Sequence, residues 1–203
     1  DEIRRRLYQA AKALRPDQRE WINRHLVIGP MAGVNVGLVD DRGESTAWHG
    51  ELTAHLRATA DQADPWRAII LDPWSRWGGP NVETDNYQAT RAVEALEQLT
   101  QIPGSPAVLV AHHTSKAAGS NNEPGQGDAR GASALVDGAR WVANLKAPGE
   151  DKRRVTLTVT KTNYTARPDP VELEIDRFGV LRPVGAVARA ATAGGNVPVT
   201  QGL

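Results

Sequence analysis

The sequence of 203 residues contains no cysteine, which excludes disulfide bonds and thiolate metal sites. This absence fits a reducing compartment, and we expect a cytoplasmic protein. No apolar run approaches the roughly 18–20 residues that a membrane-spanning helix needs, and no signal peptide is visible. The sequence therefore predicts a protein with no membrane partner.

An excess of either charge is also absent, since 24 Lys and Arg residues balance 24 Asp and Glu residues. A large basic face for binding DNA is therefore not expected. Any contact with nucleic acid has to come from a few local loops.

Several motifs of nucleotide binding and catalysis are missing. The sequence has no G-x-x-x-x-G-K-[ST] loop and not even one Gly-Lys pair. It has no H-E-x-x-H motif for zinc and no Ser-His-Asp signature. Methionine is nearly absent too: Met31 is the only one, and the chain begins with Asp1. We expect from this that the native chain is longer.

The sequence does contain the pattern of an α/β fold. Two continuous apolar runs, 68–72 and 107–113, flank a segment at 85–101 whose apolar residues recur at helical spacing. Strand, helix and strand of this size form a parallel crossover unit. Continuous hydrophobicity predicts strands covered on both faces, as in a mostly parallel sheet between helices.

The remaining pattern predicts further helices and strands around this unit. The polar, glycine-rich composition of residues 114–130 predicts a loop, and the composition of residues 184–203 predicts a flexible tail. The alternating segments 155–162 and 171–176 predict a closing antiparallel pair. The other predicted elements are helices at 2–14, 52–60 and 131–137, and strands at 25–29 and 141–145.

Polar side chains follow both apolar runs, where ligands of open α/β sheets bind. Asp72 ends the first run and can hold Mg²⁺ through water, although an aspartate before proline also begins ordinary turns. His112 and His113 end the second run. Neighbouring residues of a strand point to opposite faces, so the two histidines do not readily share a metal ion. One of them is a candidate sensor of a ligand.

Four basic residues are candidates for contacts with phosphate. Lys116 and Arg130 lie in the polar loop, which can follow a nucleic-acid backbone or be merely exposed to solvent. Arg140 and Lys161 lie near strand ends, where they can neutralise phosphate charge or form structural salt bridges.

Three of the six tryptophans also have two possible roles. They can be stacking platforms for bases, but tryptophan more often lies in a core or an interface. These residues are Trp74, Trp77 and Trp141.

Four segments in this order resemble the RecA-like ATPases of the plasmid RepA type, ring-forming replicative helicases related to the DnaB family. The segments are R-A-I-I-L-D-P, A-V-L-V-A-H-H-T-S-K, A-R-G-A-S-A-L-V-D-G-A-R-W and V-T-K-T-N-Y. The opening D-E-I-R-R-R-L is similar to the helix that follows the acidic strand end of this family. The resemblance spans residues 1–183 and implies a RecA-like, P-loop NTPase (AAA) fold over that range.

The resemblance implies roles at the nucleotide. Asp72 would be the Walker B aspartate that acts through water on the Mg²⁺ of bound ATP. His112 or His113 would be the sensor that links the γ-phosphate to a DNA-binding loop. Arg140 matches the arginine finger, and Lys161 a lysine that approaches the γ-phosphate of the neighbouring subunit.

The resemblance also implies partners. The loop that contains Lys116 and Arg130 would face single-stranded DNA in a central channel. Roles in trans require a homo-oligomer, in this family typically a hexameric ring. The implied function is an ATP-dependent DNA helicase motor in replication of the plasmid or phage type.

One departure from the family pattern is large. The phosphate-binding loop and the glutamate that activates water precede the position of Asp1 in this family. We therefore expect residues 1–183 to be the C-terminal part of an ATPase domain, with little or no hydrolysis alone. Three alternatives stay open: an inactive scaffold or DNA-binding subunit, a recombination or regulatory ATPase, and a small-molecule enzyme.

Overall fold

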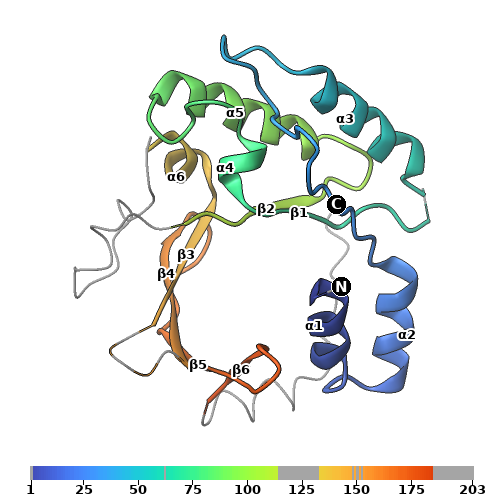
Figure 1. Ribbon diagram of the computed structural model, residues 1–203, viewed down its shortest axis with the longest axis vertical. Coiled ribbons are helices and arrows are strands. Elements are labelled where there is room, and N and C mark those ends of the chain that lie inside the picture. The colour runs from blue at the N-terminus through green and yellow to red at the C-terminus, as the bar shows by residue number, and fades with distance from the viewer. Residues whose placement is uncertain are drawn as a thin grey trace. The chain divides into compact units, whose positions relative to one another are not determined.

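A computed structural model describes residues 2–61, 63–113, 133–147, 149, 151 and 153–184 (Figure 1). The chain divides into two compact units. Unit 1 contains Asp1–Ile28, Ala143–Val159 and Thr165–Leu203, and unit 2 contains Gly29–Val142 and Thr160–Tyr164. The prediction of one ATPase domain over residues 1–183 stays a prediction, and the predicted tail lies outside the described residues except for Val184.

Unit 2 contains the predicted crossover. Strand β1 (Ala68–Leu71) pairs in parallel with β2 (Ala107–Val110), and helix α5 (Asn86–Leu99) connects them. The Asp85 side chain caps α5 by accepting hydrogen bonds from the backbone N–H groups of Tyr87 and Gln88. This cap satisfies donors that the first turn of a helix leaves unpaired, which explains why α5 begins where the sequence predicts.

Helix α3 (Ala47–Thr59) begins five residues earlier than the predicted helix at 52–60. Thr46 caps it by accepting from the His49 N–H at 3.2 Å. The first turn reads A-W-H-G, in which glycine and aromatic residues weaken the helical pattern. The cap and the packing of Trp48 and Leu52 on the core offset that weakness.

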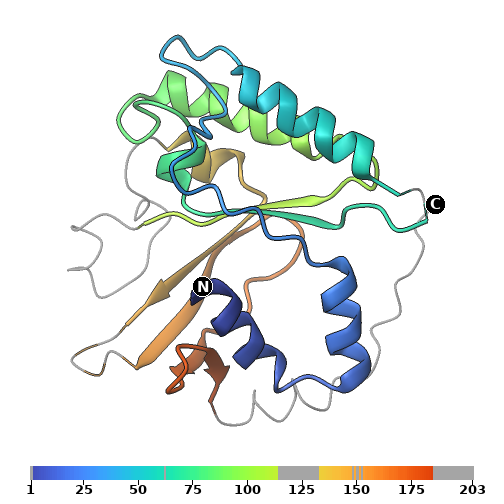
Figure 2. The same cartoon turned by 45° about the vertical axis from the view of Figure 1, so that its right-hand side comes forward.

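The helices of unit 2 cover one face of the β1–β2 sheet, as Figure 2 shows for α3 and α5. Leu71 is buried in the core, with Ile69, Val108 and Val110 packed against it. On the opposite face, Ile70 is 64% exposed and Leu109 is 49% exposed. The prediction of strands covered on both faces is therefore wrong for the described residues. An apolar run in the sequence shows only that both faces of a strand are apolar. Whether a face is buried depends on which other elements pack on it.

Two short helices complete unit 2. Helix α4 (Trp74–Trp77) follows β1 directly, and α6 (Ala134–Gly138) precedes the third strand, as the predicted helix at 131–137 does. After α4, Gly79 has φ +111° and lies against Val39. A Cβ atom built on Gly79 would lie 2.4 Å from the Val39 carbonyl oxygen, so only glycine fits this turn.

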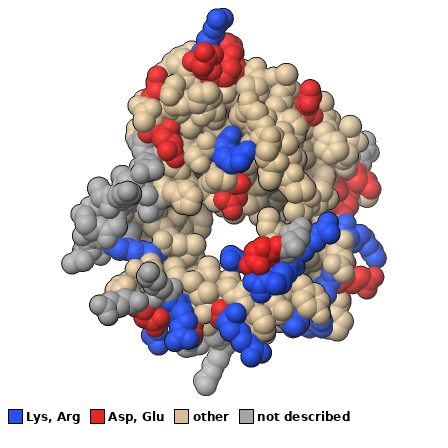
Figure 3. Space-filling model, in the orientation of Figure 1, with Lys and Arg blue, Asp and Glu red and all other residues tan. Residues whose placement is uncertain are grey.

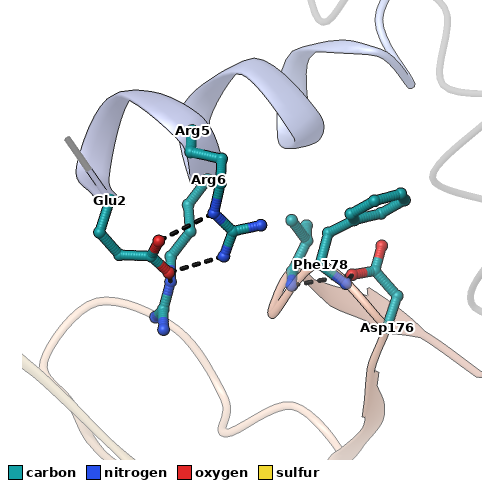
Figure 4. A network of polar contacts seen from close by, with 6 residues as sticks. Glu2, Arg5, Arg6, Asp176 and Phe178 are labelled. Carbon is teal, nitrogen blue, oxygen red and sulfur yellow. Dashed lines mark hydrogen bonds and ion pairs between the residues drawn. The ribbon is translucent and has the colours of Figure 1, made fainter.

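Unit 1 begins with helix α1 (Glu2–Ala11), which ends three residues before the predicted boundary at residue 14. The Glu2 carboxylate accepts hydrogen bonds from Arg5 at 2.8 and 2.7 Å and from Arg6 at 2.8 Å (Figure 4). These two guanidinium groups lower the pKa of Glu2 to about 2. A carboxylate in the first turn also suits the positive end of the helix dipole.

Helix α2 (Pro16–His25) was not predicted from the sequence. Pro16 was expected only to end the first helix, but it is the first residue of α2, a position where its fixed φ and missing N–H are favourable. The predicted strand at 25–29 is wrong: His25 ends α2, and residues 26–29 form no regular structure. Val27 is 69% exposed, so the apolar residues of this segment do not pack as a strand.

Unit 1 also contains most of a four-stranded sheet with the order β3-β4-β5-β6. The strands are β3 (Trp141–Lys146), β4 (Arg154–Thr162), β5 (Val171–Ile175) and β6 (Leu181–Pro183). β4 and β5 are antiparallel, with Val155 opposite Leu173, which confirms the predicted pair. Together with the two-stranded parallel sheet of unit 2, this confirms a mixed α/β fold, while the mostly parallel sheet of the RecA-like core stays a prediction.

The turn between β5 and β6 is built around Asp176. Its carboxylate accepts from the backbone N–H groups of Phe178 and Val180 and from Arg182 Nε (Figure 4 shows the backbone contacts). These donors lower the pKa of Asp176, the Val180 N–H having the largest effect. Within the described part of the chain, no helix is long and apolar enough to cross a membrane.

Candidate functional site at the carboxyl ends of β1 and β2

The ends of β1 and β2 lie side by side in unit 2. Leu71 is the register partner of Val110, and the Ala111 N–H donates to the Leu71 carbonyl at 3.0 Å. The Trp74 N–H in turn donates to the Ala111 carbonyl at 2.7 Å. The residues that follow the two strands are thereby held at one edge of the sheet, as the sequence predicts for adjacent parallel strands.

Asp72 follows β1 at this edge, and its side chain is exposed. Among the described residues, no hydrogen bond or ion pair occupies its carboxylate. Carboxylate oxygens are the ligands that Mg²⁺ prefers, and the ion commonly keeps its other positions for water and phosphate. An exposed carboxylate at a strand end fits that chemistry.

His112 and His113 follow β2 in different environments. The His112 side chain is 10% exposed, and its Nδ1 lies 3.8 Å from Glu83 Oε1, while His113 is exposed. Glu83 lies in the segment between α4 and α5. The sequence left both histidines as candidates. In the structure, His112 is the one for which a contact with a carboxylate, that of Glu83, is seen.

The Lys161 ammonium group lies at the C-terminal end of α6. It donates to the carbonyl oxygens of Val136 at 2.9 Å and Asp137 at 2.7 Å. A cation at the end of a helix satisfies carbonyl groups that have no helical partner. An ammonium group has three N–H donors, and these contacts use two of them.

Arg140 lies between α6 and β3, and its side chain is exposed. Its carbonyl accepts from the Asn163 N–H at 3.1 Å, which joins it to the residue after the end of β4. Arg140 and Lys161 therefore flank the same short helix within unit 2. Lys116 and Arg130 lie outside the described residues, so their predicted DNA contacts stay a prediction.

The three tryptophans differ in exposure. Trp74 is 1% exposed and Trp77 is 9% exposed, and both belong to the hydrophobic core of unit 2. They are core residues and not stacking platforms. Trp141, at the start of β3, is 50% exposed.

Two pockets of about 290 Å³ each lie beside α4. Ser75, Gly79 and Pro80 line both of them, and Glu83 lines the second. Among the described residues, no group of three or more His, Cys, Asp or Glu side chains is placed to hold a metal ion.

Glu83 is the residue of this site that the sequence does not reveal. It lies in the polar segment G-G-P-N-V-E-T-D, which reads as an ordinary turn before a helix. Its contact with His112 joins residues 29 positions apart in the chain. No local pattern predicts such a contact, and only the fold brings these two side chains together.

Comparisons with known proteins bear on the fold and the family of the chain. The fold is similar to the ATPase domain of the protein G-40P, with a TM-score of 0.53 and 14% sequence identity. The match covers 71% of this chain and 51% of that chain, so this chain spans about half of the structure it matches. No curated protein matches the sequence. Residues 1–119, more than half of the chain, match the family described as AAA domain. On this match, the chain belongs to the AAA domain family.

Proposed function

We propose that the protein is an ATP-dependent motor of the RepA helicase type that acts on single-stranded DNA. The observation that carries the proposal is that Asp72 and His112 follow the adjacent ends of β1 and β2 in a chain of the AAA domain family. A carboxylate and a polar sensor at adjacent strand ends are suited to a Mg²⁺-nucleotide.

Asp72 would hold the hydrated Mg²⁺ of bound ATP, because its exposed carboxylate offers the hard oxygen ligands that this ion prefers. When bound, the ion neutralises negative charge on the phosphate groups. His112, on the neighbouring strand end, would contact the γ-phosphate. His113 remains the alternative for this role.

Arg140 would act on the ATP of a neighbouring subunit. Its exposed side chain can reach a second molecule, and a guanidinium group stabilises charge on a transferring phosphoryl group. Lys161 would act beside it with the N–H donor that α6 leaves available, or would support Arg140 by holding α6. Both roles need a homo-oligomer, and we propose a hexameric ring.

Single-stranded DNA would contact Lys116 and Arg130, two basic residues of the polar loop that the resemblance to the RepA-type ATPases assigns to DNA. The proposed hydrolysis also requires a phosphate-binding loop, and residues 1–203 contain no G-x-x-x-x-G-K-[ST] motif. Activity is therefore tested on the protein as it occurs naturally.

The Asp72→Asn variant tests the proposal. Asparagine keeps the shape of the side chain but removes the charge, so ATP turnover should fall by about 100-fold or more while nucleotide binding persists. Turnover would be measured with and without single-stranded DNA, and binding with a fluorescent ATP analogue. Asp41→Asn, at another exposed aspartate of unit 2, is the matched control and should keep wild-type turnover.

Two results would contradict the proposal. Unchanged turnover in Asp72→Asn would remove Asp72 from the catalytic site. A full-length wild-type protein that binds single-stranded DNA but hydrolyses no ATP would favour the inactive scaffold.

A further inference from the structure

We propose that Glu83 is a positioning residue for His112, an inference that rests on the proposed function. Glu83 Oε1 lies 3.8 Å from His112 Nδ1, and the two side chains are 28% and 10% exposed. This distance is longer than a hydrogen bond. Contacts between side chains of a catalytic site commonly shorten when a ligand binds.

The carboxylate gives His112 a defined chemical state. A carboxylate beside Nδ1 favours the form of the ring that carries a proton on that nitrogen. The other nitrogen, Nε2, is then the one presented to a ligand. Glu83 would thereby orient His112 without touching the nucleotide itself.

The backbone around Glu83 is fixed on both sides. Val82 is 3% exposed and anchors the turn in the core. The N–H groups of Thr84 and Asp85 both donate to the Asn81 carbonyl, at 2.9 and 2.8 Å. Asp85 also caps α5. A side chain between two such anchors is well placed to hold a partner in one geometry.

The backbone before His112 is equally fixed. Ala111 donates to Leu71 and accepts from Trp74, so it is bound to both sides of Asp72. The Glu83–His112 contact therefore connects the turn before α5 with the edge that contains Asp72. His113 is exposed and lies one residue further along the chain.

A purely structural ion pair and a positioning contact differ in what a mutation changes. Loss of a structural pair lowers stability, but it leaves the turnover of the folded enzyme unchanged. Loss of a positioning contact lowers kcat and has no further effect once His112 is removed. A double-mutant cycle separates these two cases.

The experiment compares Glu83→Gln, His112→Gln and the double variant in the full-length protein. We expect Glu83→Gln to lower DNA-stimulated kcat by about 10-fold, with the KM for ATP and the melting temperature close to wild type. The double variant should have the kcat of His112→Gln alone. Glu94→Gln is the matched control, because it removes the carboxylate partner of Arg91 on α5, and it should keep wild-type kcat.

A second measurement does not depend on activity. Long-range ¹H–¹⁵N NMR spectra of the histidine rings report which nitrogen carries the proton, and His112→Gln identifies the signal of His112. We expect a proton on Nδ1 of His112 in the wild type and a change of this signal in Glu83→Gln. An unchanged signal would overturn the inference.

The kinetic outcomes separate the inference from the proposed function. If His112→Gln is impaired while Glu83→Gln matches wild type, or if the two effects multiply in the double variant, only the role of Glu83 is wrong. If His112→Gln itself keeps wild-type turnover, the sensor assignment of the proposed function fails, and the role of Glu83 fails with it.

Discussion

At the scale of single residues, His49 combines burial with a polar contact. Its side chain is 2% exposed, and its Nδ1 lies 2.6 Å from Ser45 Oγ. Burial lowers the pKa of His49, and a backbone contact with Ala95 raises it by less. Because the charged imidazole is disfavoured in this environment, His49 is neutral in the folded protein at neutral pH.

The pKa of His49 predicts acid sensitivity. The unfolded chain binds the proton near the ordinary histidine pKa of about 6.5, whereas the folded chain binds it only at lower pH. The free energy of unfolding should therefore fall as the pH drops below about 6.5, by at most about 1.4 kcal/mol per pH unit for one proton. Denaturant melts between pH 7.5 and 5.5 would measure this slope.

The slope should become shallower in His49→Gln. The control is His55→Gln, which removes an exposed histidine from the same helix and should keep the wild-type slope. Equal slopes in the wild type and His49→Gln would show that His49 does not contribute to acid sensitivity.

At the scale of elements, side chains on the two faces of β1 should contribute differently to the free energy of unfolding. Leu71 is 3% exposed, so Leu71→Ala should lower the free energy of unfolding by about 2–5 kcal/mol. Ile70 is 64% exposed, and Ile70→Thr keeps β-branching, so its cost should stay near 0.5 kcal/mol or less, about the size of ordinary surface changes. Chemical denaturation of both variants tests this asymmetry.

A large decrease in the free energy of unfolding of Ile70→Thr would contradict the exposure of the β1 face that contains Ile70. The register partner Leu109 provides a second test, because it lies on the same face and is 49% exposed. If Ile70→Thr and Leu109→Thr both cost as much as Leu71→Ala, another element covers this face in solution.

At the scale of the whole molecule, the balanced charge of the chain is unevenly distributed. Among the described residues, unit 1 has 13 Lys and Arg against 8 Asp and Glu, while unit 2 has 7 against 12. Figure 3 shows Lys and Arg side chains gathered over α1 and α2. The zero net charge of the whole chain argues against a large basic face, but one unit can still have an excess of Lys and Arg. A polyanion such as DNA would be attracted to unit 1 more than to unit 2.

The proposed oligomer makes a prediction for Arg140. Arg140→Ala should leave nucleotide binding intact and lower turnover by about 1,000-fold, because the guanidinium group would serve the ATP of a neighbouring subunit. Titration of the variant into wild-type protein should then reduce activity more steeply than simple dilution. A linear decrease would show that Arg140 does not act in trans.

The sequence by itself determined the crossover unit, the antiparallel pair and the polar strand ends with Asp72 and His112. These follow from hydrophobic periodicity, helix capping and the geometry of parallel strands, which are local or depend only on spacing. The sequence did not predict α2, because a proline at the first position of a helix looks the same as one that ends the helix before it.

Only the tertiary structure decided which apolar and polar groups have partners. It buried Trp74 and Trp77, left Ile70 and Leu109 exposed, and directed the Lys161 ammonium group to the end of α6. It also placed Glu83 beside His112. Burial and side-chain contacts depend on elements far apart in the chain, and therefore no local pattern specifies them.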